Sequence, residues 1–141
     1  MNKSPIIIVD ADAIIAQADQ NDSHHQTAIK ISQSLANLQA HVVYPATAIA
    51  ESNAYMQRVL GNTPSAYRTA MTFADPGIEI AQVNHETIKS ALKFFSPTTS
   101  KKNTLFDCIV AAIAEEYNAD AIFSFDRFYV KKGFTLAKNL K

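Results

Sequence analysis

Four carboxylates of the chain lie beside apolar segments rather than on plainly polar faces: Asp10, Glu51, Asp107 and Asp126. Like charges that lie close together raise one another's pKa values, and a bound divalent cation relieves that repulsion. A ligand set made only of oxygen atoms suits Mg²⁺ or Mn²⁺ rather than zinc. A hard cation held by a few carboxylates keeps bound waters, which serve as nucleophiles. If these side chains converge, the chemistry they indicate is metal-assisted hydrolysis.

Each of the four also has a simpler interpretation. Asp10 could cap the helix that follows it, because Asp is a favoured N-cap residue. Glu51 could face solvent, since Glu is a good helix former. Asp107 could complete a capping box at its helix start, and Asp126 could form an Asx turn. Strand ends and helix first turns lie at one rim of a parallel sheet, and this common location favours convergence.

The segment before Asp10 sets the expected architecture. Ile6 to Val9 is an unbroken apolar run, which is typical of a strand buried on both faces of a parallel sheet. We expect a strand over 5–10, and open α/β sheets bind their ligands just beyond such strand ends. Further strands are predicted at 42–44, 78–83 and 121–123, with a last one at 134–136.

Helices are predicted between these strands. Their expected ranges are 23–39, 46–60, 63–74, 84–95 and 105–117, with a short helix from Ala11. Ser23 and Gln26 form a capping-box pattern, and the last turns of the 84–95 helix carry Leu92 and Phe95. Alternating strands and helices predict an α/β fold: a three-layer α/β/α sandwich with a short, mainly parallel central sheet and right-handed crossovers.

Composition limits the class of protein. The chain has 141 residues, of which 48% are hydrophobic, and this predicts one domain over 1–141. It has one cysteine, so an internal disulfide is excluded and a reducing cytoplasm is the simplest location. The apolar run before Asp10 is too short for a signal peptide or a membrane span, so no membrane association is expected.

The charge distribution is uneven although the formal net charge is zero. The zero total gives no field typical of a nucleic-acid-binding protein. The last fifteen residues carry five basic side chains and no acid: Arg127, Lys131, Lys132, Lys138 and Lys141. They form either a solvated tail or a contact surface for phosphates.

Four segments together carry a resemblance to a known family. They are Ile8-Val9-Asp10, Ala50-Glu51, the helical block 105–114 (LFDCIVAAIA) and Phe123-Ser124-Phe125-Asp126-Arg127-Phe128. In this order they resemble the PIN-domain family, and within it the VapC-like toxins of toxin–antitoxin pairs. The resemblance spans nearly the whole chain, and the helical block and the Ser-x-Asp-x-Phe segment are its most specific parts.

The resemblance implies a PIN-like fold and a divalent-metal-dependent endoribonuclease, the toxin of a type II toxin–antitoxin system. It implies Mg²⁺ or Mn²⁺ as cofactor, RNA as substrate, an antitoxin protein as partner and a homodimer. By position, the implied metal-binding and catalytic residues are Asp10, Glu51, Asp107 and Asp126. The supporting or substrate-binding residues are Asp12, Ser124, Arg127, Lys101 and Lys102, of which the three basic ones follow only from proximity in the sequence.

Two positions depart from the family pattern. Asp12 stands where Ser, Thr or Asn is common, so it is an extra ligand, a water-positioning group or an N-cap. Phe128 comes one residue before the aromatic position that the family has, and Tyr129 fills that position.

Two other functions remain open. Val9-Asp10-Ala11-Asp12 resembles the Asp-x-Asp of haloacid-dehalogenase-type phosphatases, in which Asp10 would be the covalent nucleophile and Asp12 the general acid. A non-catalytic PIN-like module that binds RNA or protein is the second. Cys108 lies in an apolar helix, where free cysteine behaves as a small hydrophobic residue rather than a nucleophile.

Overall fold

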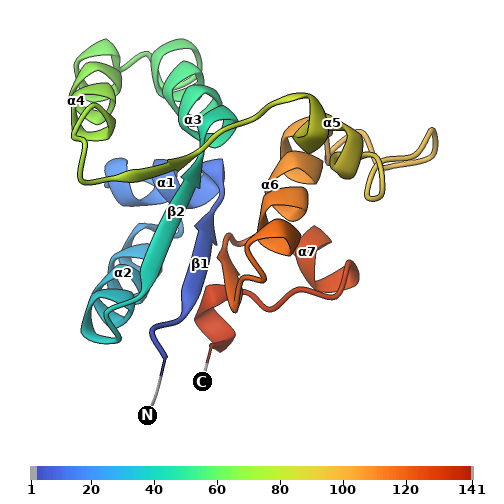
Figure 1. The fold of residues 1–141 in the computed structure, drawn as a ribbon. Helices are drawn as coiled ribbons and strands as arrows, with labels where there is room; N and C mark the ends of the chain where they lie inside the picture. Colours follow the sequence, from blue (N-terminus) through green and yellow to red (C-terminus); the bar gives the residue numbers. More distant parts are fainter. Residues whose placement is uncertain (1–2, 141) are drawn as a thin grey trace.

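The computed structural model of the chain describes residues 3–140. The strands are β1 (Ile6–Val9), β2 (His41–Pro45), β3 (Glu79–Ala81) and β4 (Ala121–Phe123). The helices are α1 (Ala11–Ala18), α2 (His25–Asn37), α3 (Ala46–Arg58), α4 (Thr63–Phe73), α5 (His85–Ala91), α6 (Leu105–Glu116) and α7 (Phe128–Lys131), followed by a 3₁₀ turn, η1 (Ala137–Asn139). Figure 1 shows these elements along the chain.

The sheet has the strand order β3-β2-β1-β4, and all its described strand pairs are parallel. In the register, Ile8 of β1 lies opposite Val43 on one side and Ile122 on the other. β1 is therefore an interior strand, and its carboxyl end opens between the ends of its two neighbours. The expected parallel sheet is confirmed.

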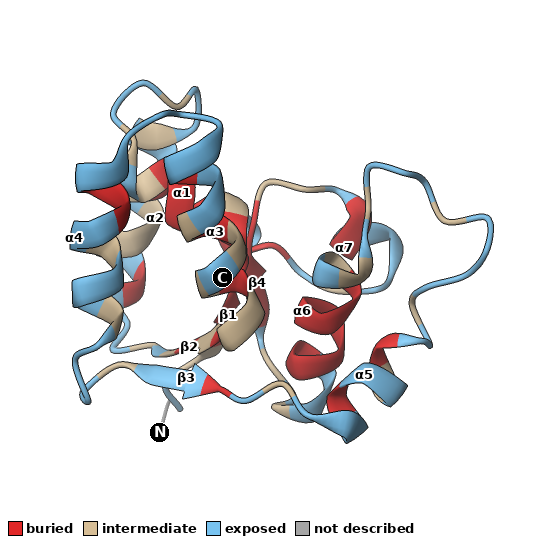
Figure 2. Cartoon of the chain, turned by 90° about the horizontal axis from the view of Figure 1, so that it is seen from above, coloured by how far each residue is buried: buried red, intermediate tan, exposed pale blue. Residues whose placement is uncertain are grey.

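The apolar run of β1 explains its central place. Ile7, Ile8 and Val9 are fully buried, and successive side chains point to opposite faces. Ile7 and Val9 pack in the core formed with α1, α2 and α3, whereas Ile8 packs in the core formed with α5, α6 and α7. Helices on both faces give the expected α/β/α sandwich, and Figure 2 shows buried residues concentrated in β1, β4 and α6, with the edge strand β3 largely exposed.

Helix α6 is the most deeply buried helix of the described chain. Its residues 108–114 are all buried, because α6 packs against α5 and α3 as well as against β1 and β2. The seven-residue apolar stretch therefore has no solvent face, as its composition predicts. This packing fixes the first turn of α6, which carries Asp107.

Several predicted boundaries are wrong. Helix α2 begins at His25 rather than Ser23, and its N-cap residue His24 makes no capping hydrogen bond through its side chain. The Asp22 carboxylate instead accepts the His24 N–H at 2.8 Å, so an Asx turn replaces the capping box. Helix α5 ends at Ala91, before Leu92 and Phe95, which are 57% and 40% exposed.

Three strands are shorter than predicted, whereas β2 extends one residue further at each end and β4 has the predicted bounds. The 78–83 segment forms only Glu79–Ala81, and the first strand ends at Val9 rather than Asp10. The strand expected at 134–136 is reduced to a single bridge between Leu136 and Ile122. The sheet thus ends at β4, and the chain then passes through α7. Of the described helices, none has the length and apolarity needed to cross a bilayer.

Candidate active site

Asp10 directly follows β1 and is only 3% exposed. One carboxylate oxygen, Oδ1, accepts the Ala11 N–H at 2.7 Å and caps α1. The other, Oδ2, accepts the Tyr129 hydroxyl at 2.7 Å and the Ser124 hydroxyl at 3.2 Å. Asp10 therefore caps α1 through Oδ1 and contacts the Tyr129 and Ser124 side chains through Oδ2.

The sheet register brings the end of β4 beside Asp10. Val9 is paired with Phe123, and the Asp10 N–H donates to the Phe123 carbonyl at 3.0 Å. Ser124 consequently lies next to Asp10 although 114 residues separate them. Because β4 ends here, Asp126 also reaches the same rim.

Five carboxylates line one small cavity of about 160 Å³ at this rim. They are Asp10, Asp12, Glu51, Asp107 and Asp126, and no lysine or arginine lines the cavity with them. They come from the start of α1, from α3, from the first turn of α6 and from the segment after β4, so the fold unites all four carboxylates singled out in the sequence, together with Asp12.

Asp12 is tied to the β4 end through one oxygen. Its Oδ2 accepts the Phe125 N–H at 2.8 Å and the Ser124 hydroxyl at 3.0 Å. Its Oδ1 is buried and accepts no hydrogen bond. A buried carboxylate oxygen without a donor is costly, and a cation is the partner that would satisfy it.

Asp107 and Asp126 share a donor. The Asn103 side-chain amide donates to Asp126 Oδ2 at 2.8 Å and to Asp107 Oδ2 at a longer 3.4 Å. Asp107 Oδ2 also accepts the Thr104 N–H at 3.0 Å, as predicted for a capping box. Asp126 Oδ1 accepts the Phe128 N–H at 2.9 Å, the Asx turn foreseen in the sequence.

Burial and mutual repulsion raise the pKa values of most of these carboxyl groups. Burial, followed by the Asp12 charge, raises the pKa of Asp10 well above its ordinary value. Burial raises the pKa of Asp12 to about 6. Burial together with the charges of Asp107 and Asp12 raises the pKa of Glu51 to about 7, and burial also raises the pKa of Asp107. The pocket resists full ionisation at neutral pH.

The residues present fit a hard divalent cation. The donor atoms are carboxylate oxygens, and one of them is buried without a hydrogen-bond partner, which a hard cation would supply. Within residues 3–140, no three His, Cys, Asp or Glu side chains are already arranged as a ligand cluster. Hydrogen bonds from Tyr129, Ser124 and Asn103 occupy carboxylate oxygens that a cation would engage.

The sequence matches the model of the PIN domain family over residues 7–134. The chain belongs to the PIN domain family. Among solved structures, the PIN-domain chain is similar to VapC20 of Mycobacterium tuberculosis, described as a Sarcin-Ricin loop cleaving toxin. The TM-score is 0.79 at 17% identity, over 92% of this chain and 96% of VapC20, which establishes the shared fold. No curated protein sequence matches the chain.

The other residues predicted to support the site of this PIN domain differ in their distance from the acidic pocket: one contacts its carboxylates, and the basic ones lie in neighbouring hollows. Ser124 is 2% exposed and bridges Asp10 and Asp12. Arg127 and Lys102 are exposed and line a groove next to the acidic pocket. Lys101 does not line that groove and lies instead on a neighbouring, more apolar hollow near Leu92.

Sequence reasoning missed two polar residues that contact the carboxylates. Tyr129 is fully buried, and its aromatic position was noted without any role for its hydroxyl. Asn103 looked like the end of a polar loop. Asn103 lies just before a helix whose first turn is acidic, and this position could have suggested a contact with Asp107. Its closer partner, Asp126, is 23 residues away in the sequence and could not be inferred in this way.

Proposed function

We propose that this PIN-domain protein is a divalent-metal-dependent endoribonuclease, the toxin of a type II toxin–antitoxin pair. One observation carries the proposal: five carboxylates from distant segments line a single cavity at the carboxyl end of β1. This is the location at which open α/β sheets bind their ligands. Membership of the PIN family and the similarity to VapC20, a toxin that cleaves RNA at the Sarcin-Ricin loop, support the choice of RNA.

In this proposal Asp10, Glu51, Asp107 and Asp126 hold Mg²⁺ or Mn²⁺. A bound divalent cation supplies positive charge for the phosphoryl transition state and acidifies water at the site. Asp12 adds negative charge through its unpartnered oxygen. Ser124 positions both Asp10 and Asp12 by donating its single proton to one or the other.

The remaining assignments are part of the same proposal. Arg127, Lys102 and Lys101 assist in binding the RNA backbone. A cognate antitoxin binds the toxin, the toxin acts as a homodimer, and it works in the cytoplasm. These follow from the resemblance to the VapC-like toxins and from the residue content of the chain.

The two alternatives find less support. A covalent nucleophile must reach its substrate, whereas Asp10 is 3% exposed and both its oxygens accept hydrogen bonds. A module that only binds has no use for five carboxylates in one cavity, because gathering them raises their pKa values at a cost in stability.

The decisive experiment is cleavage of total RNA by the purified protein with Mg²⁺, with Mn²⁺ and with a chelator. Asp107→Asn keeps the size of the side chain but removes its charge, and we expect at least a hundredfold loss of activity, roughly 3 kcal/mol of transition-state stabilisation. Glu116→Gln, an exposed position on the same helix, is the matched control and should cleave like the wild type.

Metal binding is measured separately by calorimetry with Mn²⁺. Uptake by the wild type and its loss in Asp107→Asn are expected. Activity that persists in the chelator, or that survives in Asp10→Ala, would refute the metal-dependent mechanism. Failure to take up Mn²⁺ together with RNA binding would instead establish the non-catalytic module.

A further inference from the structure

The turn between α1 and α2 carries an exposed aromatic ring beside the acidic site. The imidazole of His24 stacks on the ring of Phe125, with 4.2 Å between the ring centres and 4° between the ring planes. Phe125 in turn packs edge-on against Phe123, whose ring is buried in the core. Three rings therefore lead from the core to the surface, and the exposed His24 is the outermost of them.

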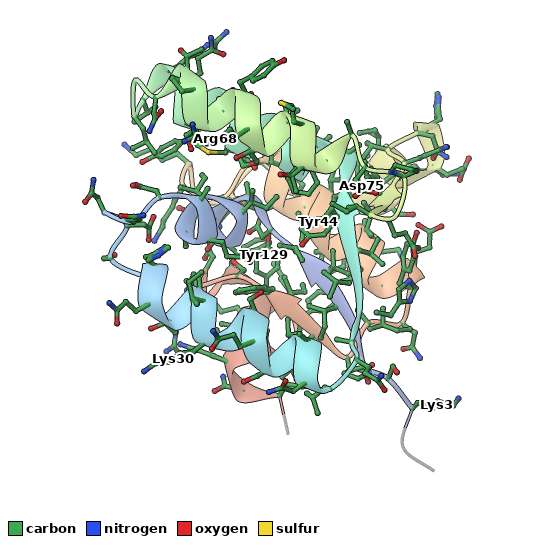
Figure 3. The ribbon with its side chains drawn as sticks, turned by 90° about the vertical axis from the view of Figure 1, so that its left-hand side faces the viewer. Lys3, Lys30, Tyr44, Arg68, Asp75 and Tyr129 are labelled. Carbon is green, nitrogen blue, oxygen red and sulfur yellow. The ribbon has the colours of Figure 1, made fainter. Side chains whose placement is uncertain are left out.

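Hydrogen bonds on both sides hold the backbone of His24 in place. Its own N–H donates to the Asp22 carboxylate at 2.8 Å, and the N–H of His25 donates to the Asp22 carbonyl at 3.0 Å. The His25 ring donates through Nδ1 to the Ala16 carbonyl at 2.6 Å, which ties the start of α2 to α1. Figure 3 shows this turn at the left-hand edge of the molecule, where the chain enters the helix that carries Lys30. The imidazole of His24 is thus positioned before any ligand arrives.

The folded chain leaves the outer face of this ring unused. Within residues 3–140, the His24 ring forms neither a hydrogen bond nor an ion pair. Because Phe125 covers one face, the exposed area of the ring belongs to its other face and its edge. A fixed, exposed aromatic ring is a platform of the kind on which proteins stack the bases of single-stranded nucleic acids.

The stacked pair lies directly beside the carboxylates. The Phe125 N–H donates to Asp12 Oδ2 at 2.8 Å, and the next residue, Asp126, lines the acidic pocket. Phe125 also lines the groove next to that pocket, together with Asp126 and Arg127. A nucleotide that neighbours the one at the acidic pocket therefore comes within reach of the His24 ring.

We propose that His24 is a base-stacking residue, whose outer face receives a nucleobase next to the scissile phosphate of the RNA. The proposal rests on the proposed function for RNA as the substrate, and it adds a contact to the bases rather than to the backbone. Stacking accepts every base, because each base has a π face. His24 therefore favours unpaired RNA, in which a base is free to leave its own stack, and fixes the strand relative to the cut.

The test is the binding of two fluorescent oligomers of equal length, measured by anisotropy in a chelator at low salt. One is a single-stranded RNA of mixed sequence, and the other is an abasic ribose-phosphate chain with the same charge. His24→Ala should weaken the binding of the RNA by between about 5- and 100-fold. It should leave the binding of the abasic chain unchanged, because that chain has no base to stack.

Two control variants separate stacking from other roles of the side chain. His24→Phe keeps a flat ring over Phe125 and should retain most of the affinity for the RNA. His85→Ala removes another exposed histidine, at the start of α5, which lines neither the acidic pocket nor the groove, and it should bind both oligomers like the wild type. Thermal unfolding of each variant verifies that the fold is retained.

Equal losses for the two oligomers in His24→Ala, or no loss for either, would overturn the proposal. So would an RNA affinity of His24→Phe as low as that of His24→Ala, because the ring face would then not be the group that binds. Cleavage of total RNA with Mg²⁺ decides the nuclease function separately. Cleavage by the wild type with unchanged RNA binding in His24→Ala would keep the nuclease and remove the stacking role, and RNA binding that depends on His24 without any cleavage would do the reverse.

Discussion

Replacing Asp12 by Asn should make the protein more stable at alkaline pH and less able to bind metal. Asn keeps an oxygen that can accept the Ser124 and Phe125 hydrogen bonds at 3.0 and 2.8 Å. It removes the negative charge that contributes to the raised pKa of Asp10. It also replaces the buried, unpartnered Oδ1 with a donor that faces other carboxylates.

The size of the effect follows from the pKa of Asp12, which rises from 3.8 to about 6 on folding. A carboxyl group with a raised folded pKa costs stability once it ionises, so the cost is absent below the unfolded pKa and complete above the folded one. The shift of 3.8 to about 6 corresponds to about 3 kcal/mol, an upper limit reached only above about pH 7.

The assay is urea unfolding in a chelator at about pH 4 and about pH 8. We expect the Asn variant to exceed the wild type by roughly 1–3 kcal/mol at the higher pH and by little at the lower one. Glu116→Gln serves as the control at an exposed carboxylate and should show no such gain. Saturating Mn²⁺ should stabilise the wild type by about 2.7 kcal/mol at a hundred times its Kd, and the variant by less.

The reasoning is refuted if Asp12→Asn is no more stable than the wild type at about pH 8. It is also refuted if the gain is the same at both pH values, because the effect would then not come from ionisation.

Two further variants test the site and the core. Tyr129→Phe removes the hydroxyl that donates to Asp10 at 2.7 Å and lies 3.5 Å from Asp107, and it should lower the free energy of unfolding by about 1.5–3 kcal/mol. The control Tyr44→Phe, at a half-buried tyrosine, should cost less. Equal losses in urea unfolding would contradict a special role for the Tyr129 hydroxyl. Ile8→Ala empties a fully buried site between the sheet and α6 and should cost about 2–5 kcal/mol in the same assay, and a loss below 1 kcal/mol would contradict the central position of β1.

The architecture was predictable because it depends on local patterns. The apolar run Ile6 to Val9 has no polar alternation, so a parallel sheet buried on both faces was the consistent interpretation. The block 108–114 likewise required a helix without a solvent face. Each of these two apolar patterns lies within a single element, and the packing of the folded chain agrees with the structure that each pattern predicts.

Boundaries were less predictable because competing local signals are nearly equal in energy. Ser23 and Asp22 both offer a side-chain oxygen near the start of α2, and the Asx turn at Asp22 prevails. Leu92 and Phe95 continue the apolar spacing of α5, yet the helix ends at Ala91, and it is Phe94 in the following turn that packs against the core.

The convergence of the carboxylates was predictable from topology, whereas their hydrogen-bond partners were not. Asp10 and Asp126 follow the carboxyl ends of adjacent parallel strands, so their proximity follows from the strand order. The hydroxyl of Tyr129 reaches Asp10 across 119 residues, and the Asn103 amide joins Asp107 to Asp126. Such contacts depend on the placement of α7 and the 96–103 loop, and no periodicity in the sequence records that placement.

The pairing of β1 with β4 has a consequence for biosynthesis. β1 pairs early with β2, but its second neighbour, β4, is synthesised more than a hundred residues later, so Asp10 gains its hydrogen bonds from Ser124 and Tyr129 only after that segment has left the ribosome. Nascent chains that end before β4 therefore lack Asp126 and the donors Ser124 and Tyr129, and the pocket is incomplete in them.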